Sequence, residues 1–328
     1  MSSPFAKETV LLLSLAQALG GCAAFAVATA PRKQAAHDDS SVAKDAEATF
    51  WLTLHGGRYD QIEPALEKLE GAYLANPNDP QTAAHIGFLH IWRANERTRL
   101  DKIPPTITDD VVLAHRYFEE SVKLDSSDAR FRGFLAASML IEGQIHHDEK
   151  LTRTGFFAMK DAVGDWPEFN LFTRGFTMSA LPFDDSKYAD AVHDQWMLLD
   201  ACTDGALDHS SADYAPFMHL DTKTGQKRVC WDSWIAPHNF EGFLLNMGDM
   251  IVKAGDPAKA RKVYAQAKLA KEYPEWPYRD LLERRIAQAD ENVALFRAPL
   301  GSPGASANKE RHIMFETPFA CSGCHQER

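Results

Sequence analysis

The sequence Cys321-Ser-Gly-Cys324-His325 stands almost at the end of this 328-residue chain. Two thiols three positions apart face the same side of one helical turn, and an imidazole follows directly. The whole chain holds only 5 cysteines and 13 histidines, so chance accounts poorly for the pattern. Because only three residues follow His325, we expect any group bound by the motif to be enclosed by residues that precede it.

This spacing is the signature of covalent haem attachment. Both thiols can add to the vinyl groups of one porphyrin, and His325 is aimed at the iron as its proximal ligand. The sequence therefore predicts one covalent haem c, bound through Cys321 and Cys324. Two other interpretations stay open: a redox-active disulfide, and a zinc site. The zinc site has only three ligands close together, whereas structural zinc prefers four.

The position of the motif also limits the fold. A small cytochrome c domain carries its motif near its start, so that domain is not expected here. Four-helix cytochromes of the c-prime type carry it near the end of the last helix, but Thr317-Pro318 interrupts any helix just before Cys321. A bare porphyrin would expose a large apolar face to water. We therefore expect the tail to fold its haem back onto the body or to hand it to another protein.

Apolar residues recur at helical spacing from Tyr59 onward, and turns divide the helices into pairs. Asn76–Asp79 is one such turn, and Gly255-Asp256-Pro257 is another. Small residues stand where paired helices must approach closely: Gly87, Ala136, Gly248, Ala260 and Ala267. The pattern resembles tetratricopeptide repeats over residues 50–150 and 235–296. This resemblance implies an all-α array of helical hairpins as the body, residues 49–297.

A turn-rich insertion at about residues 200–240 departs from the repeat pattern. Lys223-Thr224-Gly225-Gln226 reads as a reverse turn that could join two short strands. Four aromatic residues cluster around it: Phe217, Trp231, Trp234 and Phe240. The insertion is either a loop that caps the helical array or a docking surface for the porphyrin.

The first 21 residues are typical of an export signal, with an apolar stretch from Thr9 to Ala18 followed by Leu-Gly-Gly-Cys22. This end resembles the lipobox of bacterial lipoproteins, which implies cleavage before Cys22 and lipidation of its thiol. The alternatives are ordinary signal cleavage after residues 26–28 and an uncleaved anchor over residues 10–30. Residues 22–48 lack an apolar period, so we expect a flexible spacer with structure beginning near Phe50.

The cysteines are consistent with an oxidising compartment. If Cys22 carries lipid and the terminal motif carries haem, Cys202 and Cys230 remain and can pair. The alternative is two unrelated buried thiols. Three features agree: haem attachment, the export signal and an even number of remaining cysteines. Together they predict that the protein is on the periplasmic side of a bacterial membrane, either lipid-anchored or soluble. The net charge of −11 argues against a nucleic-acid-binding surface.

A linker by composition, residues 298–311, leads to the haem-attachment tail, residues 312–328, which we expect to be flexible. Two residues of the tail, Met314 and His312, are of types that serve as a sixth iron ligand. His238 in the body is a third candidate because it follows an aromatic cluster. Each of the three could equally be an ordinary packing or hydrogen-bonded residue.

Three functions fit these features. The first is an exported monohaem c-type cytochrome, an electron carrier whose helical repeats dock a protein redox partner. The second is a haem peroxidase or a gas or redox sensor with an open sixth position. The third is an assembly scaffold with a structural haem. No phosphate-binding glycine loop, GxSxG or HExxH motif points to hydrolytic or transfer chemistry.

Overall fold

The computed structural model describes residues 25–220, 222, 224–230, 240–298 and 309–325. The chain divides into two units, residues 1–35 and 36–328. In the first unit, residues 25–28 form a helical turn whose Phe25 carbonyl accepts from the Thr29 backbone N–H. None of the helices within the described ranges has the length and apolar character needed to cross a membrane.

The second unit is built from helices that follow one another along the chain. Its first half comprises α2 (Ser41–His55), η1 (Tyr59–Gln61), α3 (Ile62–Ala75), α4 (Pro80–Asn95), η2 (Arg97–Arg99), α5 (Ile107–Leu124), α6 (Ala129–His146), α7 (Glu149–Asp165) and α8 (Pro167–Met178). Its second half comprises α9 (Ser186–Thr203), η3 (Ala215–Phe217), η4 (Gln226–Val229), α10 (Phe240–Ala254), α11 (Pro257–Gln266), η5 (Ala267–Leu269), η6 (Tyr273–Glu275), α12 (Arg279–Ala287), α13 (Ala289–Arg297), η7 (Lys309–Arg311), η8 (Met314–Glu316) and α14 (Ser322–His325).

Aspartate caps begin several of these helices. The side chain of Asp79 accepts from Gln81 N at the start of α4, and Asp128 accepts from Arg130 N at the start of α6. The caps satisfy backbone donors that have no partner inside the helix. Pro80 and Pro257 occupy first-turn positions, where a missing N–H costs nothing. The aspartate caps and these prolines therefore determine the residues at which the helices begin.

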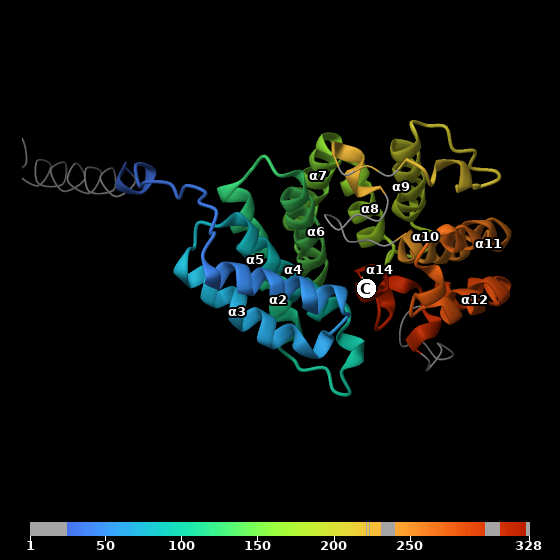
Figure 1. The fold of residues 1–328 in the computed structure, drawn as a ribbon, viewed down its shortest axis with the longest axis horizontal. Coiled ribbons are helices and arrows are strands. Elements are labelled where there is room, and N and C mark those ends of the chain that lie inside the picture. Colours follow the sequence, from blue (N-terminus) through green and yellow to red (C-terminus); the bar gives the residue numbers. More distant parts are fainter. Residues whose placement is uncertain (1–24, 221, 223, 231–239, 299–308, 326–328) are drawn as a thin grey trace, which may run out of the picture. The chain divides into compact units, whose positions relative to one another are not determined.

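The second unit is all-α, as predicted, and is an array of helical hairpins in which consecutive helices from α2 to α11 pack against each other (Figure 1). The predicted small residues lie at close approaches. A Cβ on Gly248 would stand 2.2 Å from Cε1 of Tyr264, and one on Gly87 would stand 3.1 Å from Cε2 of Phe118. Ala260 and Ala267 are fully buried. Glycine and alanine thus let paired helices come together.

The expected flexible spacer, residues 22–48, is wrong from Ser41 onward, because α2 begins there. Ser40 Oγ accepts from Ala43 N and caps the helix. Ala43 and Ala46 are buried two turns and one turn before Phe50, respectively. These alanines continue the apolar face of Phe50 at helical spacing, and their small side chains hid that period in the sequence.

The insertion contains no strands within the part of it that the structure describes. Gly225 has a φ of 72°, so a turn does occur at this point. It leads into the 3₁₀ helix η4, which packs on α8. The prediction of two short strands is therefore wrong. Trp231 and Trp234 lie outside the described residues.

The tail packs into the body. The one-turn helix α14 contacts both α2 and α10, which are far apart in the sequence (Figure 1). Residues 312–314 and 319–325 are buried. The expectation of a flexible tail is therefore wrong for residues 312–325, which fold back onto the helical body. Of the expected linker, residues 299–308 lie outside the described residues.

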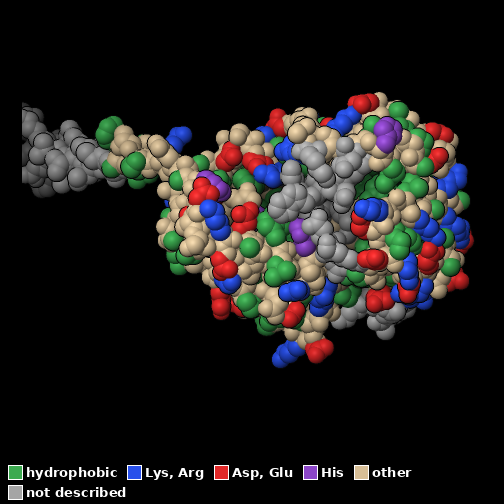
Figure 2. Space-filling view, in the orientation of Figure 1, with side chains coloured by type: hydrophobic (Ala, Val, Ile, Leu, Met, Phe, Trp, Pro, Cys, Tyr) green, Lys and Arg blue, Asp and Glu red, His purple; other side chains and the backbone are tan. Residues whose placement is uncertain are grey.

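Acidic and basic side chains are interspersed over the face shown in Figure 2. Several pairs join helices, such as Lys68 with Asp45 at 2.7 Å and Lys268 with Glu283 at 2.7 Å. These pairs are partly exposed, so each contributes little to stability.

Candidate functional site

The three residues of the terminal motif are buried: Cys321 is 7% exposed, Cys324 2% and His325 6%. The two thiols are not joined to each other. Cys321 packs with the core formed by α2, α3 and α4, whereas Cys324 packs with the larger core of the later helices. The motif therefore lies at the junction of the two main cores of the second unit.

Glu96, directly after α4, holds the motif in place. Its Oε1 accepts from the backbone N–H of Cys321 at 2.8 Å and from that of Ser322 at 2.7 Å. Its Oε2 accepts from Arg99 Nε at 2.7 Å. The side chain is completely buried. Burial raises the pKa of Glu96, while the positive charge of Arg99 and these N–H donors lower it.

Two further contacts fix the hydroxyl of Ser322, between the cysteines. Arg99 Nη2 donates to Ser322 Oγ at 2.8 Å, and Tyr278 Oη lies 3.1 Å from the same oxygen. Asn95 Nδ2 donates to Cys321 Sγ at 3.8 Å. Side chains from α4, η2 and the residue before α12 thus hold α14, the one-turn helix that carries the motif, in its orientation.

A second buried carboxylate holds the segment before the motif. Asp249 on α10 accepts from Met314 N at 2.9 Å and from Tyr264 Oη at 2.6 Å. Its other neighbour is Arg285, with Nε at 3.3 Å from Oδ1. Burial raises the pKa of Asp249 to about 6, and the Arg285 charge opposes that shift. The tail is therefore anchored at two places, by Glu96 and by Asp249.

Behind the motif lies a cavity of about 610 Å³ that both cysteine side chains and His325 line. Its walls come from α4, α6, α8 and the tail, and most of them are apolar: Phe88, Ile91, Phe134, Ala137, Ile141, Phe172, Phe176, Phe315 and Ala320. Uncharged Asn95, Thr173 and Thr177 supply the polar groups. Both thiols and the imidazole therefore face one largely apolar space.

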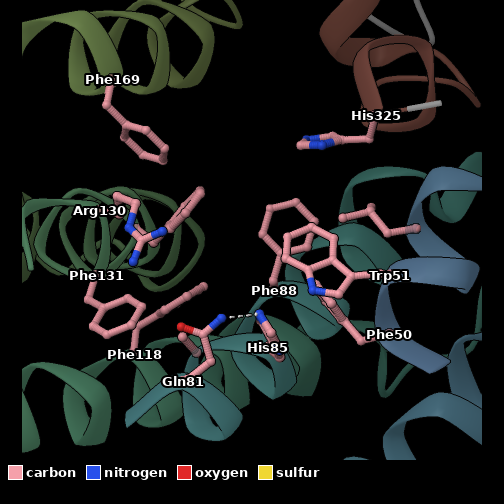
Figure 3. A pocket seen from close by; sticks show the side chains of 13 residues that line it. Phe50, Trp51, Gln81, His85, Phe88, Phe118, Arg130, Phe131, Phe169 and His325 are labelled. Atoms are coloured by element: carbon pink, nitrogen blue, oxygen red, sulfur yellow. Dashed lines mark hydrogen bonds between the residues drawn. The ribbon is translucent and has the colours of Figure 1, made fainter. Parts of the chain in front are cut away.

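A second cavity, of about 550 Å³, adjoins the first, because both are lined by Phe88, Phe134 and His325. The ring of Phe88 meets that of His325 edge to face, with centroids 5.2 Å apart. Figure 3 shows His325 across this cavity from His85, in the N-terminal half of α4, and Arg130, at the start of α6.

His85 is neutral in this setting. Its ring stacks on Phe50 with centroids 3.9 Å apart, and its Nε2 lies 3.1 Å from Gln81 Nε2. Burial, with a smaller contribution from the Arg130 charge, lowers the pKa of His85 to about 3. Because an amide nitrogen only donates, Nε2 of His85 accepts this hydrogen bond.

The two motif thiols differ from those of a redox-active pair. Burial raises the pKa of Cys321 well above its usual range, and the nearby Glu96 charge adds to the shift. Burial likewise raises the pKa of Cys324. A reactive Cys-x-x-Cys pair needs the opposite shift, because the thiolate is the nucleophile. The surroundings therefore do not favour the disulfide-exchange interpretation.

Within the described ranges, no group of three or more His, Cys, Asp or Glu side chains is arranged to hold a metal ion. A haem iron makes a smaller demand on the protein, because the porphyrin supplies the in-plane ligands and the chain supplies only axial ones.

The structure brings neither of the two sixth ligands predicted in the tail, Met314 and His312, into these cavities. Met314 is fully buried, and its methyl group packs on the motif, 2.6 Å from where a Cβ on Gly323 would stand. Nδ1 of His312 lies 3.9 Å from Oε2 of Glu316. Neither residue lines the two cavities described above. The third candidate, His238, lies outside the described residues, as does the predicted lipidation site, Cys22.

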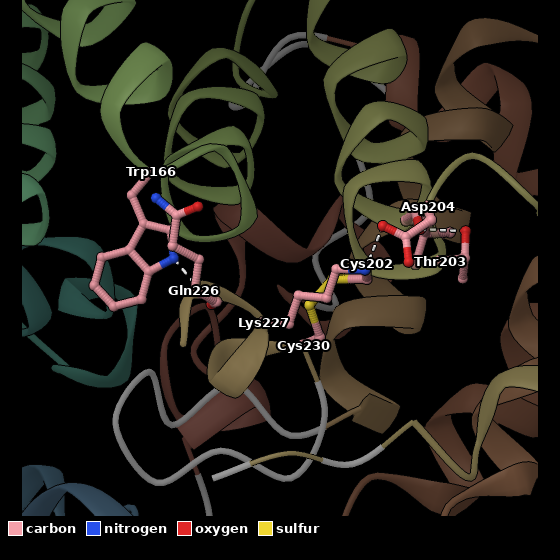
Figure 4. The surroundings of a disulfide bond; sticks show 8 residues. Trp166, Cys202, Thr203, Asp204, Gln226, Lys227 and Cys230 are labelled. Carbon is pink, nitrogen blue, oxygen red and sulfur yellow. Dashed lines mark hydrogen bonds and ion pairs between the residues drawn. A yellow bond between two sulfur atoms is a disulfide. The ribbon is translucent and has the colours of Figure 1, made fainter. Parts of the chain in front are cut away.

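Cys202 and Cys230 form a disulfide, which confirms the predicted pair. The bridge ties the end of α9 to η4 of the insertion (Figure 4). Lys227 Nζ lies 2.6 Å from Asp204 Oδ1, and Trp166 Nε1 donates to the Gln226 carbonyl at 3.0 Å. These contacts hold η4 against the array.

Sequence reasoning missed Glu96, His85 and Arg130. His85 follows Gln81 and precedes Phe88 by three positions, so the three share one face of α4. The spacing of these polar and aromatic residues could have indicated, from the sequence alone, that this face of α4 lines a site. Glu96 gave no such signal, because its partners lie 225 and 226 positions away in the chain.

No family model matches the chain, and neither a curated protein nor a solved structure does.

Proposed function

We propose that this chain is an exported monohaem c-type cytochrome that carries single electrons. The observation that carries the proposal is the convergence of Cys321, Cys324 and His325 on one apolar, aromatic-lined cavity. A haem held there would supply a one-electron couple of the iron.

The residues present fit such a group. Two free thiols that line the same cavity are the donor set for thioether bonds to vinyl groups, and His325 follows them as an axial ligand. The cavity walls are apolar enough to cover a porphyrin face that would otherwise be exposed to water. An apolar setting disfavours the additional positive charge of the oxidised iron, so the walls would raise the reduction potential.

The anchors of the tail support an electron-transfer role. Glu96 and Asp249 fix the motif from both sides, so the protein around the iron would change little between oxidation states. The disulfide between Cys202 and Cys230 favours an oxidising compartment. We propose the periplasmic side of a bacterial membrane, a lipid anchor at Cys22 and a protein redox partner.

One observation favours a second candidate, a haem that binds a small molecule at an open sixth position. Neither predicted tail ligand lines the cavities, and the cavity that holds His85 leaves about 550 Å³ beside His325, part of it open to solvent. If no side chain takes the sixth position, a diatomic ligand could bind there, and the apolar walls of the cavities would suit it.

Absorption spectra of the exported protein separate the two. An electron carrier is expected to give a low-spin reduced spectrum that carbon monoxide does not change, and to be reduced and reoxidised reversibly. A strong shift of the reduced Soret band with carbon monoxide would favour the open site. A protein that cannot be reoxidised without loss of the spectrum would contradict the carrier.

A further inference from the structure

The two adjoining cavities differ in charge. The cavity beside the thiols has only uncharged lining residues, whereas the other contains Gln81, His85 and Arg130. Among the described residues that line either cavity, Arg130 is the only one with a permanent charge. This cation therefore stands in the cavity that the cysteines do not line.

The fold holds the Arg130 side chain in position. Arg130 is the second residue of α6, and its Nε lies 3.1 Å from both carboxylate oxygens of Asp128, the cap of that helix. Its Nη2 donates to Asp128 Oδ2 at 2.5 Å. The Arg130 side chain is about three-quarters buried. A fixed, partly desolvated guanidinium is well suited to bind a carboxylate.

The insertion brings a second guanidinium to the same region. Arg228 on η4 stacks over the ring of Trp166 at 4.1 Å. Burial and then the charge of Arg130 lower the pKa of Arg228, while Asp128 opposes this shift. Arg130 thus pairs with Asp128, and the Arg228 guanidinium lies close enough to both to interact with them electrostatically. The local balance favours an anion.

The chemistry of a covalent haem matches this polarity. Its vinyl edge would be bonded to Cys321 and Cys324, and its propionate carboxylates stand on the opposite edge. We propose that Arg130 binds a propionate carboxylate of that haem at the end of the joined cavities away from the thiols. This inference rests on the proposed function. Arg130 is then a positioning residue that also sets the electrostatic field at the iron.

The loss of this cation has a predictable effect. Without Arg130 the propionate charge is uncompensated, which stabilises the oxidised iron and lowers the midpoint potential. The same loss raises the pKa of the propionate, so the midpoint potential depends more strongly on pH near neutrality. A purely structural arginine would produce neither change.

The test uses the full-length, haem-loaded protein and its Arg130→Gln and Arg130→Lys variants. The control is Arg132→Gln, on the same helix, whose partner is Asp165 and which does not line the cavities. Spectroelectrochemical titration at several pH values measures the midpoint potential, and the pyridine haemochrome assay measures haem content. All four proteins keep the Asp128 cap, and far-UV circular dichroism checks their folding.

We expect Arg130→Gln to have full haem content, a lower midpoint potential and a steeper pH dependence. Arg130→Lys, which keeps the charge, and Arg132→Gln are expected to stay near wild type. Equal potentials in Arg130→Gln and wild type overturn the inference while leaving the proposed function standing. A wild-type protein without covalent haem overturns the proposed function itself.

Asp128→Asn gives a second, independent measurement, because asparagine also caps helices. Removal of the competing carboxylate strengthens the field of Arg130, so the midpoint potential is expected to rise. A potential that falls or stays unchanged in this variant contradicts the inference.

Discussion

Glu96 Oε1 accepts a hydrogen bond of 2.8 Å from the backbone N–H of Cys321, across 225 positions of the chain. The same oxygen accepts from the next residue, so one side chain satisfies two backbone donors at the start of α14. The site is therefore built from an early and a late segment of the second unit. Its stability depends on the buried carboxylate of Glu96.

Replacement of Glu96 by alanine is expected to destabilise the protein strongly. It leaves the Cys321 and Ser322 N–H groups without their acceptor, and it removes the carboxylate that faces the Arg99 guanidinium. Loss of one member of a buried charged pair costs on the order of 3 kcal/mol or more. Urea denaturation measures the loss, and limited proteolysis detects release of the tail.

Glu149→Ala is the matched control, because Glu149 pairs with Arg153 on the surface, with both side chains about 70% exposed. This change is expected to cost less than about 0.5 kcal/mol. Equal effects of the two substitutions would show that Glu96 does not hold the tail.

Gly248→Ala tests the close packing of the hairpin formed by α10 and α11. A Cβ at this position would stand 2.2 Å from Cε1 of Tyr264. The ring cannot easily move, because its hydroxyl donates to the buried Asp249. We expect a loss of about 1–3 kcal/mol in the free energy of unfolding.

Gly71→Ala, on α3, is the control for that substitution, since no atom lies within 4 Å of its added Cβ. Alanine favours helix over glycine by up to about 1 kcal/mol, so this variant is expected to be as stable as wild type or more stable. A stable Gly248→Ala protein would contradict the packing account.

His85 predicts a pH dependence of stability. Burial lowers its pKa from 6.5 to about 3 in the folded state. Between these values the unfolded chain binds the proton and the folded chain does not, so stability falls as the pH falls below 6.5. The contribution of neutral His85 to stability is fully present above that pH. Below it, the free energy of unfolding falls with a slope that approaches about 1.4 kcal/mol per pH unit.

Urea denaturation of wild type and His85→Phe at several pH values between 4 and 7 measures this slope. Phenylalanine preserves the stack on Phe50 and removes the titrating group. As the pH falls, the free energy of unfolding of the wild type is expected to decrease relative to that of His85→Phe. A constant difference over this range would show that His85 does not titrate as described.

The Cys202–Cys230 disulfide closes a loop whose ends are 28 positions apart. Its replacement by two alanines is expected to cost about 3 kcal/mol by the chain-entropy model. Thermal unfolding with and without dithiothreitol measures the effect. The double variant should not respond to the reductant, and a wild type that also fails to respond would contradict the bridge.

The sequence contained enough information to predict the helical hairpins. Gly248, Ala260 and Ala267 stand at helical spacing around the turn at Asp256-Pro257, and local periodicity is sufficient to place such elements. The same local reasoning failed at Ala43 and Ala46, because alanine gives a weak apolar signal.

The site was predictable only in part. The motif itself is local, so its three residues could be named from the sequence. Its surroundings are not local: Phe88 and Asn95 belong to α4 and Glu96 directly follows it, more than two hundred positions earlier in the chain. No periodicity relates such distant residues, and only the packing of α14 between α2 and α10 brings them together.

The central claim is tested most directly by the haem content of the exported protein, matured in a bacterial host that attaches haem c. A pyridine haemochrome assay with mass spectrometry of the intact chain is expected to find one haem that resists acid–acetone extraction. The Cys321→Ala/Cys324→Ala variant should lack it, whereas the Cys202→Ala/Cys230→Ala variant should retain it. A colourless wild-type protein whose Cys321 and Cys324 both react as free thiols after unfolding would contradict the account.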